Sequence, residues 1–102
     1  MTNPLLKGLR PIHPGEMLRE DILPAVGRPK TEIARLLGIS RQTLYDILNE
    51  KQPVTPAMAL RFAKMFGGSA ESWINMQRNY DLKIAAAELG GALEAIPHLE
   101  AA

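Results

Sequence analysis

The sequence predicts an all-α domain of five helices, and three of its features lead to that prediction. Apolar residues recur at the spacing of helices, and no segment alternates apolar and polar residues as a half-buried strand does. Prolines, glycines and small polar residues interrupt this spacing where helices would begin and end. With 102 residues, 46% of them hydrophobic, the chain has the size and composition of one small domain with its own core.

The first part of the chain predicts an irregular arm followed by one helix. Residues 1–12 contain prolines and a glycine, so we expect no regular structure there. Pro14 suits the first position of a helix, because the N–H group that proline lacks would have no partner there. We expect this helix over residues 14–23, because Pro24 disfavours a helical conformation in the residue before it.

The next two helices are short and are separated by a tight turn. Residues 31–37 form the first of them, and Gly38 can adopt the left-handed conformation that ends a helix. Ser40 is a favourable N-cap, because its hydroxyl can accept a hydrogen bond from a free backbone N–H of the following turn. The second short helix is therefore expected over residues 41–50.

Two longer helices and a tail complete the predicted chain. A fourth helix is expected over residues 56–66, where a proline follows a capping threonine and two glycines follow the last helical residue. A fifth helix starts after the N-cap Ser69 and extends to about residue 89, before another pair of glycines. These boundaries predict one domain over residues 13–89 and a flexible tail over residues 90–102.

The types of residue present argue against catalytic and metal-binding chemistry. The chain has no cysteine, so disulfides, cysteine-ligated zinc and thiol nucleophiles are excluded. Its two histidines, His13 and His98, lie at opposite ends of the chain, which disfavours a histidine-rich metal centre. The sequence shows no nucleophile–base pair, glycine-rich phosphate loop or acidic metal cluster. We therefore expect a protein that is not an enzyme and that needs neither a metal nor a cofactor.

The sequence also lacks the signals of membrane insertion and export. No apolar run approaches the roughly 18 residues that a membrane span needs. Residues 1–10 have neither the apolar block nor the cleavage site of a signal peptide. We therefore expect a cytoplasmic protein that does not enter a membrane.

The net charge of the chain is only +1, but the positive charge is concentrated in one segment. The segment from residue 28 to residue 41 contains a single acid and four cationic residues, which are Arg28, Lys30, Arg35 and Arg41. A local basic patch on an otherwise neutral protein is typical of a surface that meets phosphate on one face only.

Residues 30–49 have the pattern of a helix-turn-helix, in which a short turn containing glycine joins two short helices. Ala34 provides the small residue that is needed where the two helices cross closely. Four residues later, Gly38 tolerates a positive φ, and Ile39 fills the angle between the helices. All of these positions are occupied as the motif requires.

The outward face of the second helix of this motif is polar. At about 100° per residue, five side chains that can form hydrogen bonds fall within one arc opposite the apolar side. They are Arg41, Gln42, Tyr45, Asp46 and Asn49. Arginine suits the edge of guanine, glutamine and asparagine suit adenine, and aspartate accepts from cytosine. We interpret these residues as base-reading, with Gln42 and Asp46 one turn apart and able to hold each other in position. The alternative is an ordinary solvated helix face.

A second group of polar residues lies at the starts of the two helices or beside the base-reading face. Such positions suit contacts that place a protein on phosphates rather than contacts that read bases. The predicted phosphate-positioning residues are Lys30, Thr31, Arg35, Ser40 and Thr43.

Several further motifs occur in a fixed order along residues 12–83. They are His13-Pro14-Gly15-Glu16, Leu18-Arg19-Glu20, the helix-turn-helix, Leu48-Asn49-Glu50-Lys51, Thr55, Ala59-Leu60-Arg61, Glu71-Ser72-Trp73, Asn75, Gln77 and Tyr80-Asp81-Leu82. In these motifs the chain resembles the HigA-type antitoxins, a branch of the XRE/Cro-like family of helix-turn-helix regulators. The resemblance implies a five-helix, lambda-repressor-like domain that forms a homodimer and binds a palindromic operator in its own promoter. It also implies a partner, a RelE-like ribonuclease toxin, but assigns the toxin contact to no residue.

Two sets of apolar residues near the end of the chain allow two interpretations each. The fifth helix carries a stripe at helical spacing, formed by Trp73, Met76, Tyr80 and Ile84. Packing against the other helices and a dimer interface explain this stripe equally well. The tail carries a shorter strip, formed by Leu93, Ile96 and Leu99, which a loosely docked terminus explains better than a partner-binding surface. His13 is expected to cap a helix or a turn rather than to act as a ligand or catalyst.

Taken with the resemblance, these features predict a sequence-specific, homodimeric transcriptional repressor that is the antitoxin of a type II toxin–antitoxin pair. One alternative is a stand-alone XRE-type regulator without a toxin, which the neighbouring gene would distinguish. Another is a helical protein-interaction module that has lost DNA binding. The polar face with Arg41 and Gln42, which has no apolar patch, argues against that second alternative.

Overall fold

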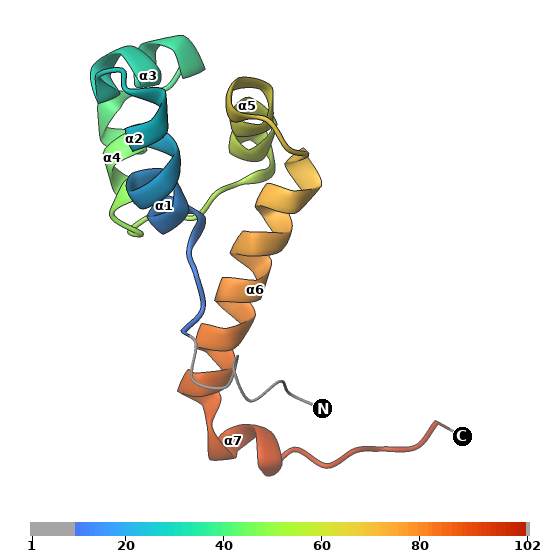
Figure 1. Cartoon of the computed structure of the whole chain (residues 1–102). Helices are drawn as coiled ribbons and strands as arrows, with labels where there is room; N and C mark the ends of the chain where they lie inside the picture. Colours follow the sequence, from blue (N-terminus) through green and yellow to red (C-terminus); the bar gives the residue numbers. More distant parts are fainter. Residues whose placement is uncertain (1–9, 102) are drawn as a thin grey trace.

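The computed structural model describes residues 10–101, and this part of the chain is helical and contains no strand (Figure 1). In chain order its elements are α1 (Pro14–Met17), η1 (Leu18–Ile22), α2 (Leu23–Val26), α3 (Lys30–Leu37), α4 (Arg41–Leu48), α5 (Pro56–Phe66), α6 (Ala70–Leu89) and α7 (Gly91–Glu94). The elements α1, η1 and α2 follow one another without a break and form the first of five helices, and α7 is one additional turn. The five-helix, all-α prediction is confirmed, and residues 1–9 of the predicted arm lie outside the described residues.

The first helix continues to Val26, so the prediction that it ends before Pro24 is wrong. In a regular α-helix, a proline at this position would collide with the carbonyl group four residues earlier. In the π-helical segment η1, the Leu23 N–H instead donates to the Leu18 carbonyl, five residues earlier. This wider turn gives Pro24 room, and the helix ends only at Gly27, whose φ is 71°.

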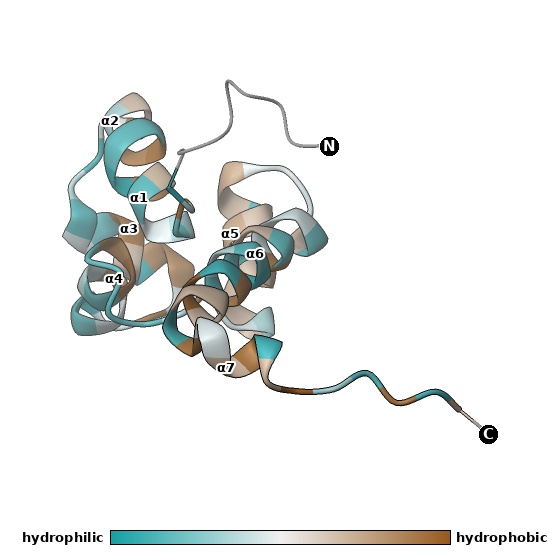
Figure 2. Ribbon diagram, turned by 90° about the horizontal axis from the view of Figure 1, so that it is seen from below, coloured by the Kyte–Doolittle hydropathy of each residue, from teal (hydrophilic) through white to brown (hydrophobic). Residues whose placement is uncertain are grey.

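The core lies between the five helices and is mostly aliphatic, with an aromatic cluster where α5 meets α6. Phe62 is fully buried, and Trp73 packs against it with the ring centroids 5.2 Å apart. Phe66 lies beside both rings. The other buried apolar residues come from the helices before α6 and from the loop that precedes α5, and the apolar parts of these helices turn toward one another (Figure 2). They are Leu18, Leu23, Ile33, Ala34, Leu37, Leu44, Ile47, Leu48, Val54, Met58 and Ala59.

The long helix α6 begins in the core and ends outside it. Ser69 caps its N-terminus as predicted, because its hydroxyl accepts a hydrogen bond from the Ser72 N–H at 3.0 Å. Among the residues of α6 only Trp73 and Gln77 are buried, and every described residue from Asp81 onward is exposed. Twenty residues at about 1.5 Å each make α6 about 30 Å long. The helix therefore carries the end of the chain away from α3 and α5, as Figure 1 shows.

The predicted tail contains one helical turn, α7, and then continues as irregular chain to residue 101. All of its described side chains are exposed. Within the described part of the chain, no helix combines the length and the apolar character that a membrane span requires.

Candidate nucleic-acid interface

Helices α3 and α4 form the predicted helix-turn-helix, and the turn between them has the predicted geometry. Gly38 has a φ of 76° and ends α3. The Gly38 N–H donates to the Arg35 carbonyl and the Ile39 N–H donates to the Ala34 carbonyl, each at 3.1 Å. These paired bonds form a Schellman motif, which reverses the chain tightly and satisfies the last carbonyl groups of α3. Ala34 is buried, as the close approach of the two helices requires.

The start of α4 is fixed by its predicted N-cap. The Ser40 hydroxyl accepts a hydrogen bond from the Thr43 N–H at 3.0 Å and donates to the Thr43 hydroxyl at 2.8 Å. Both hydroxyl groups therefore hold the cap, and the Thr43 hydroxyl proton remains available to an outside acceptor. A hydroxyl donor at the N-terminus of a helix favours the binding of an anion, because the positive end of the helix dipole lies there.

Most of the predicted base-reading residues project from α4. Arg41, Gln42 and Tyr45 are exposed, and Asp46 is half-buried beside them. The Gln42 side-chain amide donates to Asp46 Oδ1 at 2.7 Å, which confirms the predicted pairing of these two side chains. Asn49 is also exposed, but it is the C-cap of α4 rather than a residue within the helix.

The prediction that this helix extends to residue 50 is wrong, because α4 ends at Leu48. Glu50 has a φ of 61°, a left-handed conformation that only glycine adopts without strain. Its N–H donates to the Ile47 carbonyl at 3.0 Å, and the Lys51 N–H donates to the Asp46 carbonyl at 2.8 Å. A second Schellman motif therefore ends α4, with a glutamate in place of the usual glycine.

Arg19, which lies in η1, holds this unusual helix end in place. Its guanidinium donates to the Leu48 carbonyl at 2.5 Å and lies 3.5 Å from the Glu50 carboxylate. The Leu48 carbonyl is one of the groups that a helix end leaves without a partner inside the helix. A cation at this position also offsets the negative end of the α4 dipole. Sequence analysis assigned no role to Arg19, whose only signal was its place in one of the family motifs.

Arg61, which lies in α5, likewise binds the C-terminal end of α3, the first helix of the motif. Its guanidinium donates to the Leu37 carbonyl at the end of α3. The same guanidinium lies 2.8 Å from the point where a Cβ atom of residue 38 would lie. The positive φ of Gly38 favours glycine at this position, and a Cβ atom would in addition make the end of the Arg61 side chain shift. This role was also missed by sequence analysis.

The first helix contacts the backbone of α4 directly through Gly15. A Cβ atom on this glycine would lie 1.8 Å from the carbonyl oxygen of Ile47, far inside any permitted contact. No other residue type fits here without moving α1 away from α4. The position of α4 therefore depends on a close backbone contact with the first helix, in addition to the contact made by Arg19.

His13 caps the helix that carries Gly15, which confirms its predicted role. Its Nδ1 atom accepts a hydrogen bond from the Gly15 N–H at 2.9 Å, and its ring packs edge-on against Tyr80 of α6 with centroids 5.0 Å apart. Burial lowers the pKa of His13, although the carboxylates of Glu50 and Asp81 oppose this shift. The cap needs an unprotonated Nδ1, so the lowered pKa and the hydrogen bond favour the same neutral form.

The predicted phosphate-positioning residues of α3 are all free to meet solvent. Lys30 is the first residue of the helix, and Thr31 and Arg35 are exposed along it. The nearby Arg28 pairs with Glu32 at 2.8 Å, so its charge is partly offset within the protein. In the described part of the chain, no group of histidine and acidic residues has the arrangement of a metal site.

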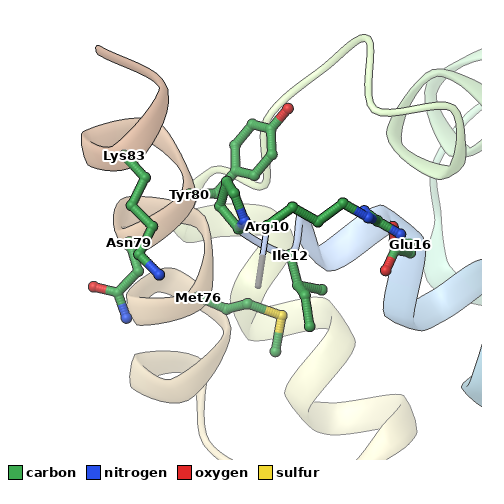
Figure 3. A pocket seen from close by; sticks show the side chains of 8 residues that line it. Arg10, Ile12, Glu16, Met76, Asn79, Tyr80 and Lys83 are labelled. Carbon is green, nitrogen blue, oxygen red and sulfur yellow. The ribbon is translucent and has the colours of Figure 1, made fainter. Parts of the chain in front are cut away.

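The apolar stripe predicted on the last helix is divided between the core and the surface. Trp73 is buried and belongs to the core of its own protomer, where it also donates to the Gly67 carbonyl. Met76 and Tyr80 are half-buried and line a hollow between the start of the first helix and α6 (Figure 3). Ile84 is exposed one turn further along. Only the last three residues of the stripe therefore remain available to a second molecule.

Comparisons with known proteins agree with this geometry. Residues 18–73 match the model of a helix-turn-helix family, and they include all of α3, α4 and α5. Virulence-associated protein I of Dichelobacter nodosus is 45% identical over 74 residues, which span 72% of this chain and 68% of that protein.

Two solved structures have the same fold over nearly the whole chain. The antitoxin GraA in complex with its operator is 35% identical, with 99% of each chain covered and a TM-score of 0.83. The Pseudomonas aeruginosa antitoxin HigA with the higBA promoter is 37% identical, with 89% of this chain and all of that chain covered, and a TM-score of 0.83. The chain therefore belongs to the XRE-like helix-turn-helix family and is a homologue of the HigA-type antitoxins.

Proposed function

We propose that this protein is a DNA-binding antitoxin that represses its own promoter by binding a palindromic operator as a homodimer. The observation that carries the proposal is the exposed polar face of α4, which is held rigidly at both ends by contacts from outside the helix. Two structural relatives are described as bound to an operator or a promoter, and this supports the same use of the fold here. We call α4 the recognition helix from this point on.

The side chains of the recognition helix suit the edges of base pairs in the major groove. Arg41 can donate two hydrogen bonds to the O6 and N7 atoms of a guanine. Gln42 already donates one amide proton to Asp46. This contact sets the direction of the Gln42 carbonyl oxygen and of its second amide proton. A side chain held in this way loses less conformational freedom when it binds a base. We therefore assign base reading to Arg41, Gln42 and Asp46, with Tyr45 and Asn49 at the edge of the same surface.

Residues beside the recognition helix would place it on the DNA backbone. We assign this role to the exposed residues of α3, Lys30, Thr31 and Arg35, and to the capping pair Ser40 and Thr43. Contacts of this kind add affinity for any DNA sequence and make binding depend on salt concentration. They complement the base-reading surface and do not replace it.

A dimer follows from the small size of one such surface. A single protomer with a net charge of +1 offers one short recognition helix, so we expect specific binding to need two copies on a two-fold operator. Two recognition helices would enter successive major grooves about 34 Å apart. We place the dimer interface on the part of α6 that carries Met76, Tyr80 and Ile84, because Trp73 is used within the protomer.

The antitoxin part of the proposal concerns a protein partner. Relatives of this chain are described as antitoxins, and we propose a RelE-like toxin as the partner that this chain neutralises. The protein would act where the promoter is, in the cytoplasm, and its role is binding rather than catalysis. Co-expression of the chain with the product of the adjacent reading frame should give a stable complex and relieve any toxicity of that product.

Operator binding is tested by titrating the protein into labelled DNA from its own upstream region and into a shuffled sequence of the same length. Arg41→Ala should weaken binding to the upstream DNA by about 1–3 kcal/mol and leave binding to shuffled DNA nearly unchanged. Lys30→Ala should weaken both equally and flatten the salt dependence. Arg78→Ala, which removes an exposed arginine from α6, is the matched control and should change neither. Equal losses on both DNAs for Arg41→Ala would exclude its base-reading role.

A further inference from the structure

A shallow apolar groove with a cationic rim lies between α3 and α5. It has a volume of about 440 Å³ and is lined by Leu36, Leu37, Leu60, Arg61, Lys64 and Met65. Two of these leucines are unusually open to water, since Leu36 is 48% exposed and Leu60 is 64% exposed. No acidic residue lines the groove, so it suits a ligand that is both apolar and negatively charged.

The tail, residues 90–102, has the properties that complement this groove, because it is both apolar and negatively charged. Leu93, Ile96 and Leu99 are 45%, 67% and 81% exposed and contact no part of the core. Residues 90–102 contain two glutamates, at positions 94 and 100, and no lysine or arginine. The tail is therefore an acidic segment with an unpartnered apolar strip.

Other hollows of the described surface fit this segment less well. The hollow shown in Figure 3 and a neighbouring one both contain the Glu16 carboxylate. A third, along α6, contains Asp81, and a fourth beside Pro24 is cationic but offers no exposed leucine. The first of these hollows also contains Arg10 and Lys83, and the third also contains Arg78, so charges of both signs line them. Among these hollows, only the groove between α3 and α5 combines exposed leucines with a rim, formed by Arg61 and Lys64, that would attract the acidic tail without an opposing carboxylate.

The tail is poorly placed to reach the groove of its own protomer. Helix α6 leads it about 30 Å away from α5, so it would have to unwind α7 and return along the whole of α6 (Figure 1). A second copy offers a shorter route. If a two-fold axis crosses α6 at right angles, the two α6 helices run antiparallel, and the end of each lies beside the start of the other. Only three residues separate the start of α6 from the end of α5, which carries Lys64 and Met65.

We propose that residues 91–101 of each protomer bind the groove between α3 and α5 of the other protomer, so that the two tails lock the dimer by exchange. This inference rests on the proposed dimer through α6 and identifies a second, reciprocal interface for it. The leucines and the isoleucine of the tail would cover Leu36 and Leu60, and Glu94 or Glu100 would pair with Lys64. Binding at α3 would also tie the dimer contact to the helix-turn-helix itself.

Disulfide cross-linking tests the contact directly, because the chain has no cysteine of its own. Leu60→Cys and Ile96→Cys chains are mixed under reducing conditions, allowed to exchange subunits and then oxidised. A disulfide between positions 60 and 96 of different chains is expected, identified by mass spectrometry of the linked peptides. Val26→Cys mixed with Ile96→Cys is the control, since Val26 is an exposed apolar residue on α2 outside the groove, and it should give no such product.

A charge exchange tests the recognition chemistry. Lys64→Glu and Glu94→Lys should each slow the formation of the 60–96 disulfide by roughly threefold or more, and the two changes together should restore it. Cross-linking no faster than in the Val26 control, or a link that forms only within a single chain carrying both cysteines, would overturn the proposal. Sedimentation of the unmodified protein distinguishes a failure of the tail exchange from a failure of the proposed dimer. A dimer that binds operator but does not cross-link refutes only the tail exchange, whereas a protein that stays monomeric on operator DNA refutes the proposed dimer itself.

Discussion

Gly15 is the residue whose replacement most directly tests how the recognition helix is held. The change Gly15→Ala adds one methyl group, and its carbon would lie 1.8 Å from the Ile47 carbonyl oxygen. An ordinary close contact between carbon and oxygen is about 3.3 Å. The first helix must therefore move away from α4 by about 1.5 Å, because both partners in the overlap are backbone and no side chain can rotate aside.

The expected loss of stability follows from this overlap. Overpacking of a well-packed contact lowers the free energy of unfolding by about 1–3 kcal/mol. Alanine favours a helix over glycine by up to about 1 kcal/mol, which offsets part of that loss. Displacement of the Gly15 N–H also weakens its hydrogen bond to His13, a cap that contributes about 1 kcal/mol. The net loss is then about 1–3 kcal/mol, which lowers the Tm of a domain of this size by roughly 5–20 °C.

Thermal unfolding followed by circular dichroism measures this effect. The matched control is Gly91→Ala, because no heavy atom lies within 4 Å of the position that its new Cβ would occupy, and its Tm should stay near that of the parent protein. Operator affinity of Gly15→Ala should also fall at a temperature where it remains folded, since the contact acts on the backbone of the recognition helix. A Gly15→Ala protein with the Tm and the operator affinity of the parent would refute the argument that this backbone contact positions α4.

Three further predictions concern other contacts around the same helices. Arg19→Ala should leave the Leu48 carbonyl without its partner and reduce operator affinity more than Arg78→Ala does. An Arg19→Ala protein with the operator affinity of the parent would show that the contact between Arg19 and the end of α4 does not matter for binding. The stability contributed by neutral His13 should be complete above its ordinary pKa of about 6.5 and should decrease as the pH falls below that value, because burial lowers its pKa in the folded protein. His13→Asn keeps a capping oxygen but removes the titration, so its urea unfolding should depend less on pH between about 5.5 and 7 than that of the parent, and equal slopes would contradict the assignment. Ile84→Glu should give a folded monomer with poor operator affinity by sedimentation, whereas Leu82→Glu, an equally drastic change outside the predicted stripe, should remain dimeric. Tyr80→Glu should in addition lower the Tm, because it also removes the ring contact with His13.

The features that could be predicted from the sequence are those that depend on neighbouring residues. The caps Ser40 and Ser69, the positive φ of Gly38 and the pairing of Gln42 with Asp46 each involve residues at most four positions apart. Local rules of capping, turn geometry and helical spacing are enough for such features. For the same reason the fold class and the helix-turn-helix were predicted correctly.

The features that could not be predicted depend on contacts between distant residues or on an uncommon backbone. Arg19 and Glu50 are 31 positions apart, and nothing in either residue alone indicates that the arginine stabilises a left-handed glutamate at the end of α4. The π-helical turn that admits Pro24 likewise overrides the usual effect of proline on a helix. Trp73 is buried in its own protomer, although it belongs to the same apolar stripe as residues that are exposed. Helical spacing alone predicts the stripe but does not predict which of its residues the protomer buries.

The residues that position the recognition helix are different from the residues that would determine its sequence specificity. Gly15 and Arg19 both contact carbonyl groups of α4, and the Ser40 cap contacts a backbone N–H. None of these contacts depends on the side chains that face outward from the helix. Arg41, Gln42, Tyr45 and Asp46 can therefore be exchanged together without disturbing the packing that places them. A chain in which these four residues are replaced by those of a relative should keep its Tm within a few degrees while its preferred operator changes. The same packing could therefore support many operator specificities, with changes of specificity located in the outward side chains of α4 and changes in the placement of α4 located in the first helix.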